Sequence, residues 1–215
     1  MERFAIEKLI SWKDSADRKP MILRGARQVG KTWLMQEFGR RCYRNTVYFN
    51  FDEEDELKSI FESNKNPARI IELLSMISGE KILPGDTLVL FDEVQECPEA
   101  LNSLKYFCEK AGEYHIISAG SLLGTLLAQP KSYPVGKVNL LEIAPLTFDE
   151  FLLANDEGLY RYYCSIQKEQ SIEEIFHKRL MELYHYYLII GGMPECVSSW
   201  LKHKNPEKVL QIQRE

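Results

Sequence analysis

The sequence lacks any metal-binding or disulfide pattern of cysteines. The 215 residues include five cysteines, an odd number, and no two of them stand at C-x-x-C spacing. This scatter argues against both a zinc site and a disulfide framework. It favours reduced thiols in a cytosolic protein, where each cysteine is more typical of a small apolar filler than of a nucleophile.

Long apolar runs and an excess of positive charge are also missing. In the first stretch, MERFAIEKLISWKDS, charged residues interrupt the apolar ones every two or three positions, which fits neither a signal peptide nor a membrane span. The net charge of −5 argues against a uniformly basic nucleic-acid-binding surface, although it is compatible with a local basic patch. We therefore predict a cytoplasmic protein that does not enter a membrane.

What the chain does have is the composition of a globular protein, with 45% hydrophobic and 27% charged residues. Short apolar, β-branched or aromatic runs alternate with segments whose apolar residues recur at helical spacing. This alternation predicts an α/β fold, with a parallel sheet sandwiched between helices. The predicted strands are 21–24, 45–51, 86–93, 114–121 and 137–143, and the predicted helices are 3–13, 31–42, 54–63, 67–78 and 98–112.

The chain changes character after about residue 145. Thr147 and Glu150 stand at the spacing of a capping box, and long helical patterns follow. We predict a core over residues 1–146 and a mostly helical segment over 147–215, which is either a lid or the start of a truncated C-terminal domain. Residues 206–215 keep a helical pattern without a stop signal, so we expect the chain to continue; a frayed natural C-terminus is the alternative.

A glycine-bracketed loop between the first predicted strand and the next helix carries the clearest chemical signal. It matches G-x-x-x-x-G-K-[ST] at every fixed position, and its residues are Gly25, Ala26, Arg27, Gln28, Val29, Gly30, Lys31 and Thr32. Its glycines allow a tight turn whose N–H groups face phosphate oxygens, and the helix adds its positive dipole end. Lys31 would contact the β- and γ-phosphates, and the Thr32 hydroxyl would bind Mg²⁺. An incidental glycine-rich turn is the alternative.

Polar residues also end two further predicted strands. TLVLFDE ends in Asp92 and Glu93, and ligands bind beyond the carboxyl ends of parallel strands. Asp92 is expected to steady Mg²⁺ through its water shell, and Glu93 to orient or deprotonate the water that attacks the γ-phosphate. Ser118 and Ser121 lie around the end of HIISAGS, and Ser121 is a candidate to hydrogen-bond that water or the γ-phosphate. Ordinary capping is the alternative for the acids and for the serines.

Guanine-reading motifs are missing. Asn64-Lys65 lacks the aspartate of N-K-x-D and precedes the Asp92 strand, and Asp92 does not begin an Asp-x-x-Gly sequence. These absences favour ATP over GTP. A small-molecule kinase, which shares the loop, stays an alternative, although adjacent Asp-Glu is more typical of an enzyme that activates water.

Taken together, these motifs resemble the AAA-type P-loop ATPases of bacteria and archaea that carry a C-terminal domain of unknown function. The resemblance covers nearly the whole chain, and its segments are RGARQVGKT, YFNFDE, LVLFDEVQECP, SAGSLLG, SYPVGKVNLLEIAPLTFDEFL and GGMPECV. It implies an AAA+-like core with the Walker A, Walker B and sensor strands adjacent in the sheet. It also implies a chain that continues past Glu215.

The family's functional residues match this sequence only in part. Lys31 and Thr32 match the Walker A pair, and Asp92 and Glu93 match the Walker B pair. The sensor usually reads Thr-Gly-Ser, so in Ala119-Gly120-Ser121 the serine matches and the threonine does not. Many members have Gly-Arg where this chain has Gly136-Lys137. Lysine cannot form a bidentate clamp on phosphate, so we assign no arginine finger.

We therefore predict an ATPase that binds Mg-ATP and acts as a switch or motor on an unknown protein or nucleic-acid partner, with an oligomer compatible with the sequence. One alternative is a nucleotide-gated binding module with little turnover. Another is an ATPase coupled to nucleic-acid binding through a missing C-terminal domain. The basic stretches GRRCYR and KHKNPEK are more typical of solvated faces, and YHYYL is more typical of helix packing.

Overall fold

The computed structural model describes residues 1–121, 136–167 and 171–214. The chain divides into two compact units, and each is described by itself. One unit is Ala5–Ile143, and the other combines Met1–Phe4 with Ala144–Glu215. The described residues do not include the part of the SAGSLLG motif that follows its second serine. They also do not include most of SYPVG.

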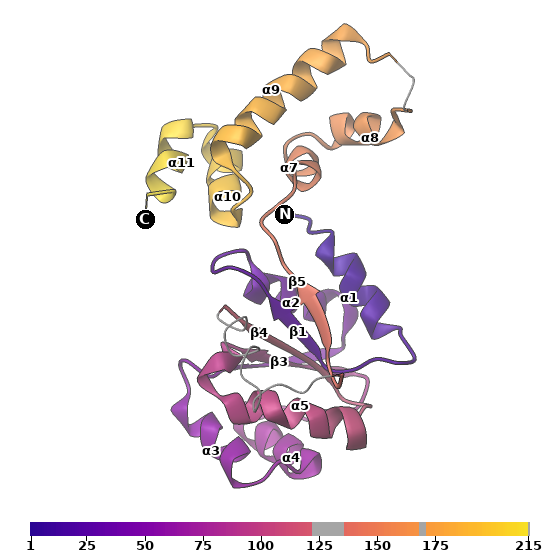
Figure 1. The fold of residues 1–215 in the computed structure, drawn as a ribbon, viewed down its shortest axis with the longest axis vertical. Helices are drawn as coiled ribbons and strands as arrows, with labels where there is room; N and C mark the ends of the chain where they lie inside the picture. The colour runs from indigo at the N-terminus through magenta and orange to yellow at the C-terminus, as the bar shows by residue number, and fades with distance from the viewer. Residues whose placement is uncertain (122–135, 168–170, 215) are drawn as a thin grey trace. The chain divides into compact units, whose positions relative to one another are not determined.

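Five parallel strands form the sheet of the larger unit, in the order β2-β3-β4-β1-β5 (Figure 1). The strands are β1 (Met21–Arg24), β2 (Asn45–Asn50), β3 (Thr87–Asp92), β4 (His115–Gly120) and β5 (Asn139–Glu142). The helices are α1 (Ala5–Lys13), α2 (Lys31–Cys42), α3 (Asp55–Ser63), α4 (Pro67–Ser78), the short 3₁₀ helix η1 (Val94–Glu96) and α5 (Pro98–Lys110). The predicted α/β class is confirmed.

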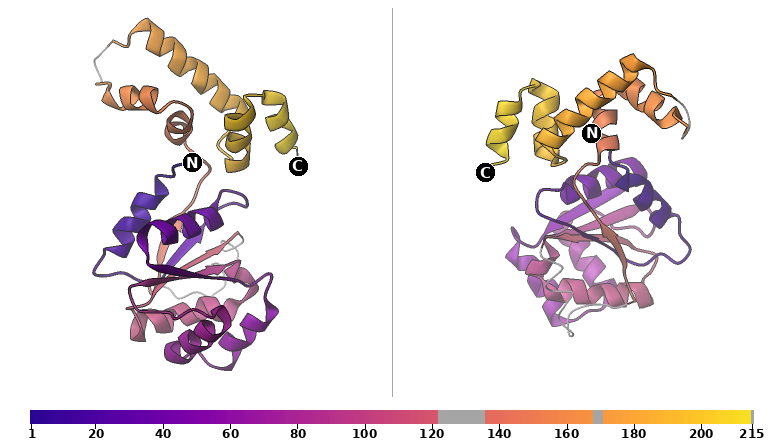
Figure 2. Two further views of the ribbon diagram at one scale, coloured as in Figure 1. Left: turned by 180° about the vertical axis from the view of Figure 1, so that it is seen from behind. Right: turned by 45° about the horizontal axis from the view of Figure 1, so that its top comes forward.

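Helices cover both faces of this sheet (Figures 1 and 2). Helices α3, α4 and α5 lie on one face, and α1 and α2 lie on the other. Val89 and Phe91 of β3 belong to the apolar core on the α3–α5 face. Side chains alternate along a strand, so Leu88 and Leu90 point to the α2 side, and all four are fully buried. Burial on both faces explains why this strand has a continuous apolar run.

The parallel topology brings several strand ends to one edge of the sheet. β1 ends at Arg24, β3 at Asp92 and β4 at Gly120, and these three strands are contiguous as β3-β4-β1. The loop with the P-loop pattern and the two acids therefore follow strands separated only by β4. This is the edge at which α/β sheets bind ligands.

The smaller unit is helical. It contains α7 (Phe148–Asn155), α8 (Glu157–Ser165), α9 (Glu174–Ile190), α10 (Pro194–His203) and α11 (Pro206–Ile212). The predicted capping box is confirmed, because Thr147 Oγ1 accepts from the Glu150 N–H at 3.2 Å and Glu150 Oε2 accepts from the Thr147 N–H at 2.9 Å. Helix α8 lies where the sequence pattern predicted no separate helix. Among the described residues, no helix combines the length and apolar character needed to cross a bilayer.

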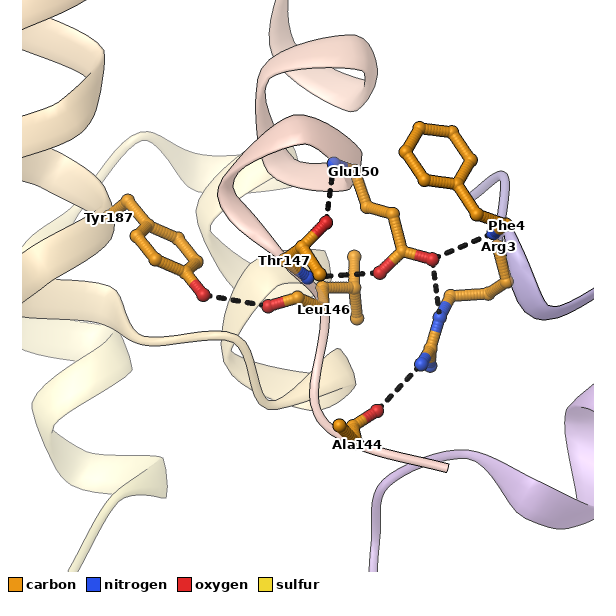
Figure 3. Close-up of polar contacts among 7 residues, drawn as sticks. All are labelled: Arg3, Phe4, Ala144, Leu146, Thr147, Glu150 and Tyr187. Carbon is orange, nitrogen blue, oxygen red and sulfur yellow. Dashed lines mark hydrogen bonds and ion pairs between the residues drawn. The ribbon is translucent and has the colours of Figure 1, made fainter. Parts of the chain in front are cut away.

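The first residues of the chain are bound to this helical unit rather than to the sheet (Figure 3). Arg3 Nε lies 3.2 Å from Glu150 Oε1, and the same oxygen accepts from the Phe4 N–H at 2.8 Å. The Arg3 guanidinium also donates to the Ala144 carbonyl at 2.7 Å. Both charged side chains are buried, and they are paired and hydrogen-bonded as buried charges must be. The chain consequently passes between the two units twice, after Phe4 and after Ile143.

A glycine of the GGMPECV motif has a local packing role. The Leu146 N–H donates to the Gly192 carbonyl at 2.7 Å. The Leu146 carbonyl accepts from the Tyr187 hydroxyl at 2.8 Å (Figure 3). A Cβ on Gly192 would lie 2.1 Å from the Leu146 oxygen. Glycine is required here because the two backbones approach so closely.

A buried histidine in the larger unit makes stability depend on pH. His115 packs edge-on against Trp12 and Tyr43, and its Nδ1 lies 2.6 Å from the Tyr43 hydroxyl. Burial lowers the pKa of His115 from 6.5 to about 4, and the charges of Arg18 and Lys13 act in the same direction. His115 is therefore neutral in the folded protein at neutral pH.

We expect the free energy of unfolding to fall by roughly 1–3 kcal/mol as the pH drops from about 6.5 to about 4. In this window the unfolded His115 binds a proton and the folded one does not, so protons favour the unfolded state. His115→Asn should flatten this part of the profile, whereas His203→Asn, at an exposed histidine, should not. Urea unfolding at several pH values measures the effect. Parallel profiles for the wild type and His115→Asn would contradict this origin.

Candidate functional site

The loop with the P-loop pattern joins the carboxyl end of β1 to the first turn of α2. Gly25 has φ of 156°, and a Cβ there would lie 2.2 Å from the Ile143 carbonyl oxygen, so a larger residue does not fit. Gly30 has φ of 86° and directly precedes the first helical residue. Gln28 is also left-handed, with φ of 63°. The two glycines thus occupy backbone positions that other residues reach only with strain.

The start of α2 is suited to bind an anion. Helix α2 begins at Lys31, and its N-cap residue, Gly30, has no side chain that could cap the first turn. The first N–H groups of a helix lack helical partners and carry the positive end of the dipole, which favours phosphate there. Val29 is fully buried, whereas Ala26, Arg27 and Gln28 are exposed. The loop is therefore anchored at one end and accessible in its middle.

Lys31 lies against the loop. Its ammonium donates to the carbonyl oxygens of Gly25 at 3.0 Å and Ala26 at 2.7 Å, and only 8% of the residue is exposed. Burial lowers the pKa of Lys31, and the negative charges of Glu93 and Asp92 oppose this shift. A cation is thus held where the loop N–H groups and the two acids converge.

The two residues predicted to bind the metal are in direct contact. Thr32 Oγ1 donates to Asp92 Oδ2 at 2.6 Å, and Asp92 is buried. The same Oδ2 accepts from the Tyr48 hydroxyl at 2.9 Å, and Oδ1 accepts from the Glu93 N–H at 3.0 Å. Burial raises the pKa of Tyr48, and the negative charge of Asp92 raises it further. Tyr48 is therefore a neutral hydroxyl donor.

The donor set fits Mg²⁺ only in combination with a phosphate ligand. Thr32 and Asp92 present hard oxygen atoms side by side, as Mg²⁺ prefers. Within the described ranges, no group of three or more His, Cys, Asp or Glu side chains could hold a metal alone. Mg²⁺ in nucleotide sites takes one or two protein ligands and completes its shell with phosphate and water. The arrangement matches that requirement.

Glu93 is held in an unusual conformation directly after β3. Its φ is 48°, in the left-handed region, and non-glycine residues in this region cluster at functional sites. Glu93 Oε2 accepts from Gln95 Nε2 at 2.5 Å. Gln95 Oε1 is buried and has no hydrogen-bond partner among the described residues. Gln95 therefore uses its amide to hold the carboxylate of Glu93.

The two serines of the next strand have different surroundings. Ser121 directly follows β4 and is partly exposed, at the edge where the loop and the acids lie. Ser118 is fully buried on the same face as Ile116, towards the α3–α5 core, and its hydroxyl has no partner among the described residues. Ser121 stays a candidate, whereas Ser118 lies in the core. Lys137, which stands where many members of the resembled family have arginine, forms an ion pair with Glu109 at 3.0 Å.

Sequence reasoning missed Tyr48 and Gln95. Tyr48 contributed only to a strand signal, although its position between Val47 and Phe49 already placed its side chain on the opposite face from those two. Its contact with Asp92 depends on β2 pairing with β3, where Tyr48 stands opposite Leu90. Gln95 stands only two residues after Glu93. This closeness in sequence was the one sign that the two side chains could meet.

Comparisons with known proteins agree with this architecture. A family model described as an AAA domain matches residues 17–152. No curated protein matches the chain in sequence. The chain resembles the RuvB Holliday junction branch migration motor of Thermotoga maritima, with 16% identity and a TM-score of 0.51, over 98% of this chain and 68% of that one. At this identity the likeness concerns the fold alone.

Two further solved structures are similar at lower TM-scores. AMPPCP-bound DnaA from Aquifex aeolicus has 17% identity and a TM-score of 0.48, over 99% of this chain. The Aeropyrum pernix ORC1 protein in complex with DNA has 14% identity and a TM-score of 0.44, over 97% of this chain and 79% of that one. This chain spans only 64% of the length of the DnaA chain.

Proposed function

The chain belongs to the AAA domain family of nucleotide-binding P-loop ATPases, as its motifs predicted, and from that premise we propose that it binds Mg-ATP and hydrolyses the terminal phosphate. The observation that carries the proposal is the 2.6 Å contact between Thr32 and Asp92, beside the Lys31 loop. It joins a phosphate-binding loop to a metal-binding acid at one edge of the sheet. The further C-terminal domain that the resemblance implied stays a prediction.

In this proposal the loop binds the phosphates of ATP. The N–H groups between Gly25 and Thr32 donate to phosphate oxygens, and the start of α2 adds its dipole. The Lys31 ammonium exchanges the loop carbonyls for oxygens of the β- and γ-phosphates. Thr32 would ligate Mg²⁺ directly, and Asp92 would hold the water shell of the ion. The ion would supply positive charge against the phosphate oxygens, and charge neutralisation together with positioning is most of what phosphoryl transfer requires.

Glu93 supplies the base in this proposal. Its carboxylate orients the attacking water or accepts its proton, a role that typically contributes about 10²–10⁴-fold. The Gln95 amide, 2.5 Å from Glu93 Oε2, holds the carboxylate in place. Ser121 hydrogen-bonds the water or the γ-phosphate. A small-molecule kinase would instead activate a hydroxyl of its own substrate.

We further propose that hydrolysis drives a switch or motor acting on a protein or nucleic-acid partner, in the cytoplasm. The alternative is a nucleotide-gated binding module with little turnover. One observation favours a binding role for the helical unit: helix α9 exposes large apolar side chains, with exposed fractions of 73% at Ile175, 62% at Leu188 and 51% at Ile189. Exposed apolar side chains that adjoin one another, as Leu188 and Ile189 do, are typical of interaction sites. Either role is compatible with an oligomer.

Phosphate release by the purified protein tests the proposal. We expect release with Mg-ATP, little release with Mg-GTP, and none when EDTA removes the metal. Trp33 follows Thr32 and is 41% exposed, whereas Trp12 and Trp200 are buried, so tryptophan fluorescence reports binding near the loop. Tight Mg-ATP binding without release would favour the binding module. Absence of ATP binding would contradict both.

A further inference from the structure

The carboxylate of Asp92 is held by more donors than the P-loop pattern accounts for. Its Oδ2 accepts two hydroxyl hydrogen bonds, from Thr32 at 2.6 Å and from Tyr48 at 2.9 Å. Its Oδ1 accepts from the Glu93 N–H at 3.0 Å. The Thr32 donor comes from α2 and the Tyr48 donor from β2, on the neighbouring strand of the sheet. Donors from separate elements thus restrict rotation of this carboxylate.

The position of Tyr48 is set by strand alternation. Val47 and Phe49 belong to the core on the α3–α5 face, so Tyr48 projects to the opposite face. Tyr48 stands opposite Leu90, two residues before Asp92, so Tyr48 and Asp92 share that face. Tyr48 therefore does not belong to the apolar core on the α3–α5 face, and its hydroxyl donates to Asp92.

The Thr32 hydroxyl has one proton and two lone pairs. Because its proton is donated to Asp92, its lone pairs stay available to a metal. That orientation depends on where Asp92 Oδ2 lies, and Tyr48 fixes the same oxygen. Without the Tyr48 hydroxyl, the carboxylate could rotate, and both its Oδ1 and the Thr32 oxygen would lose their alignment. Outer-shell partners of this kind typically contribute about 10–100-fold to metal affinity.

We propose that Tyr48 is a positioning residue for the metal of the nucleotide site, acting through Asp92 and Thr32. The proposal rests on the Mg-ATP binding proposed above. It assigns a role in metal affinity to a residue of β2, outside the loop and outside the Asp-Glu pair.

The test removes the hydroxyl and measures metal affinity. Tyr48→Phe and wild-type protein are saturated with a non-hydrolysable ATP analogue, and Mg²⁺ is titrated while Trp33 fluorescence is followed. Electron paramagnetic resonance of Mn²⁺ gives the metal affinity independently of fluorescence. We expect the metal dissociation constant to rise about 10–100-fold in Tyr48→Phe. The affinity for the analogue in EDTA should not change, because the Tyr48 hydroxyl donates to Asp92 and not to a phosphate-binding group of the loop.

Tyr43→Phe is the matched control. It also removes a half-buried tyrosine hydroxyl, but that hydroxyl meets His115 instead of Asp92, so metal affinity should stay at the wild-type value. A wild-type metal affinity in Tyr48→Phe would overturn the role of Tyr48 and leave Mg-ATP binding intact. Equal loss of analogue binding with and without metal would overturn it too, since it indicates a general structural defect.

Absence of metal-dependent analogue binding in the wild type would overturn the proposed function and this role together. If near-ultraviolet circular dichroism shows that Tyr48→Phe does not fold, Tyr48→Met carries the same test with a flexible apolar side chain. A 10–100-fold weaker metal affinity in Tyr48→Met would then support the role, and a wild-type value would overturn it.

Discussion

Replacing Glu93 with glutamine should leave ATP bound but slow its hydrolysis by about 10²–10⁴-fold. Glutamine has the shape of glutamate and still offers an oxygen to the Gln95 amide, which lies 2.5 Å from the carboxylate, so the side chain should keep its place. An amide cannot accept a proton from water at neutral pH. The effect should therefore fall on turnover and spare binding.

Single-turnover phosphate release and equilibrium binding separate these two effects. Glu96→Gln is the matched control, because Glu96 is an exposed acid three residues further on, in η1, and should hydrolyse ATP at the wild-type rate. If Glu93→Gln hydrolyses ATP at that rate, Glu93 is not the base. If Glu93→Gln loses ATP binding as well, the residue shapes the site instead of acting on water.

Replacing Lys31 with alanine should weaken ATP binding by about 10²–10⁴-fold, which corresponds to the loss of two charge-assisted hydrogen bonds of roughly 1.5–3 kcal/mol each. Lys31 is the buried cation of the loop, and its ammonium lies within hydrogen-bond distance of two loop carbonyls. Alanine removes the charge that faces Asp92 and Glu93, and phosphate would then meet those acids without compensation.

Equilibrium binding of labelled ATP measures this loss. Lys8→Ala, at an exposed lysine of α1, should bind ATP like the wild type. Lys31→Arg separates charge from shape, since the guanidinium keeps the charge but is larger and planar. Wild-type affinity in Lys31→Ala would contradict a role for this residue in phosphate binding. If Lys31→Arg binds ATP more tightly than Lys31→Ala and close to the wild type, the charge at this position matters more than the compact shape of an ammonium.

Local sequence patterns predicted those strands, helices and caps that depend on residues close together in the chain. The α/β class was readable because buried parallel strands have continuous apolar runs and helices have a 3.6-residue period. The capping box of α7 was readable because Thr147 and Glu150 are three residues apart. Helix α8 was missed because only Leu159 of this helix is buried, and its tyrosines pack against rings outside the helix, such as Tyr162 on Phe176.

Long-range contacts lay beyond those signals. Arg3 looked like part of the first helix, and its burial depends on Glu150, a residue 147 positions later. Tyr48 looked like an ordinary strand residue, and its partner Asp92 is reached only through the pairing of β2 with β3. Neither contact produces a recognisable pattern in the surrounding sequence, because each depends on which elements become neighbours in space.

The sequence by itself determined that this protein has a loop with the P-loop pattern, a later strand ending in two acids, and the order in which they occur. These features depend on residues close together in the chain: glycine conformations, strand patterns and helix starts. They can therefore be predicted from the sequence. Only the tertiary structure decided that Thr32 and Tyr48 share one oxygen of Asp92, and that residues 1–4 join the helical unit. Those outcomes depend on strand order and on the burial of charges far apart in sequence.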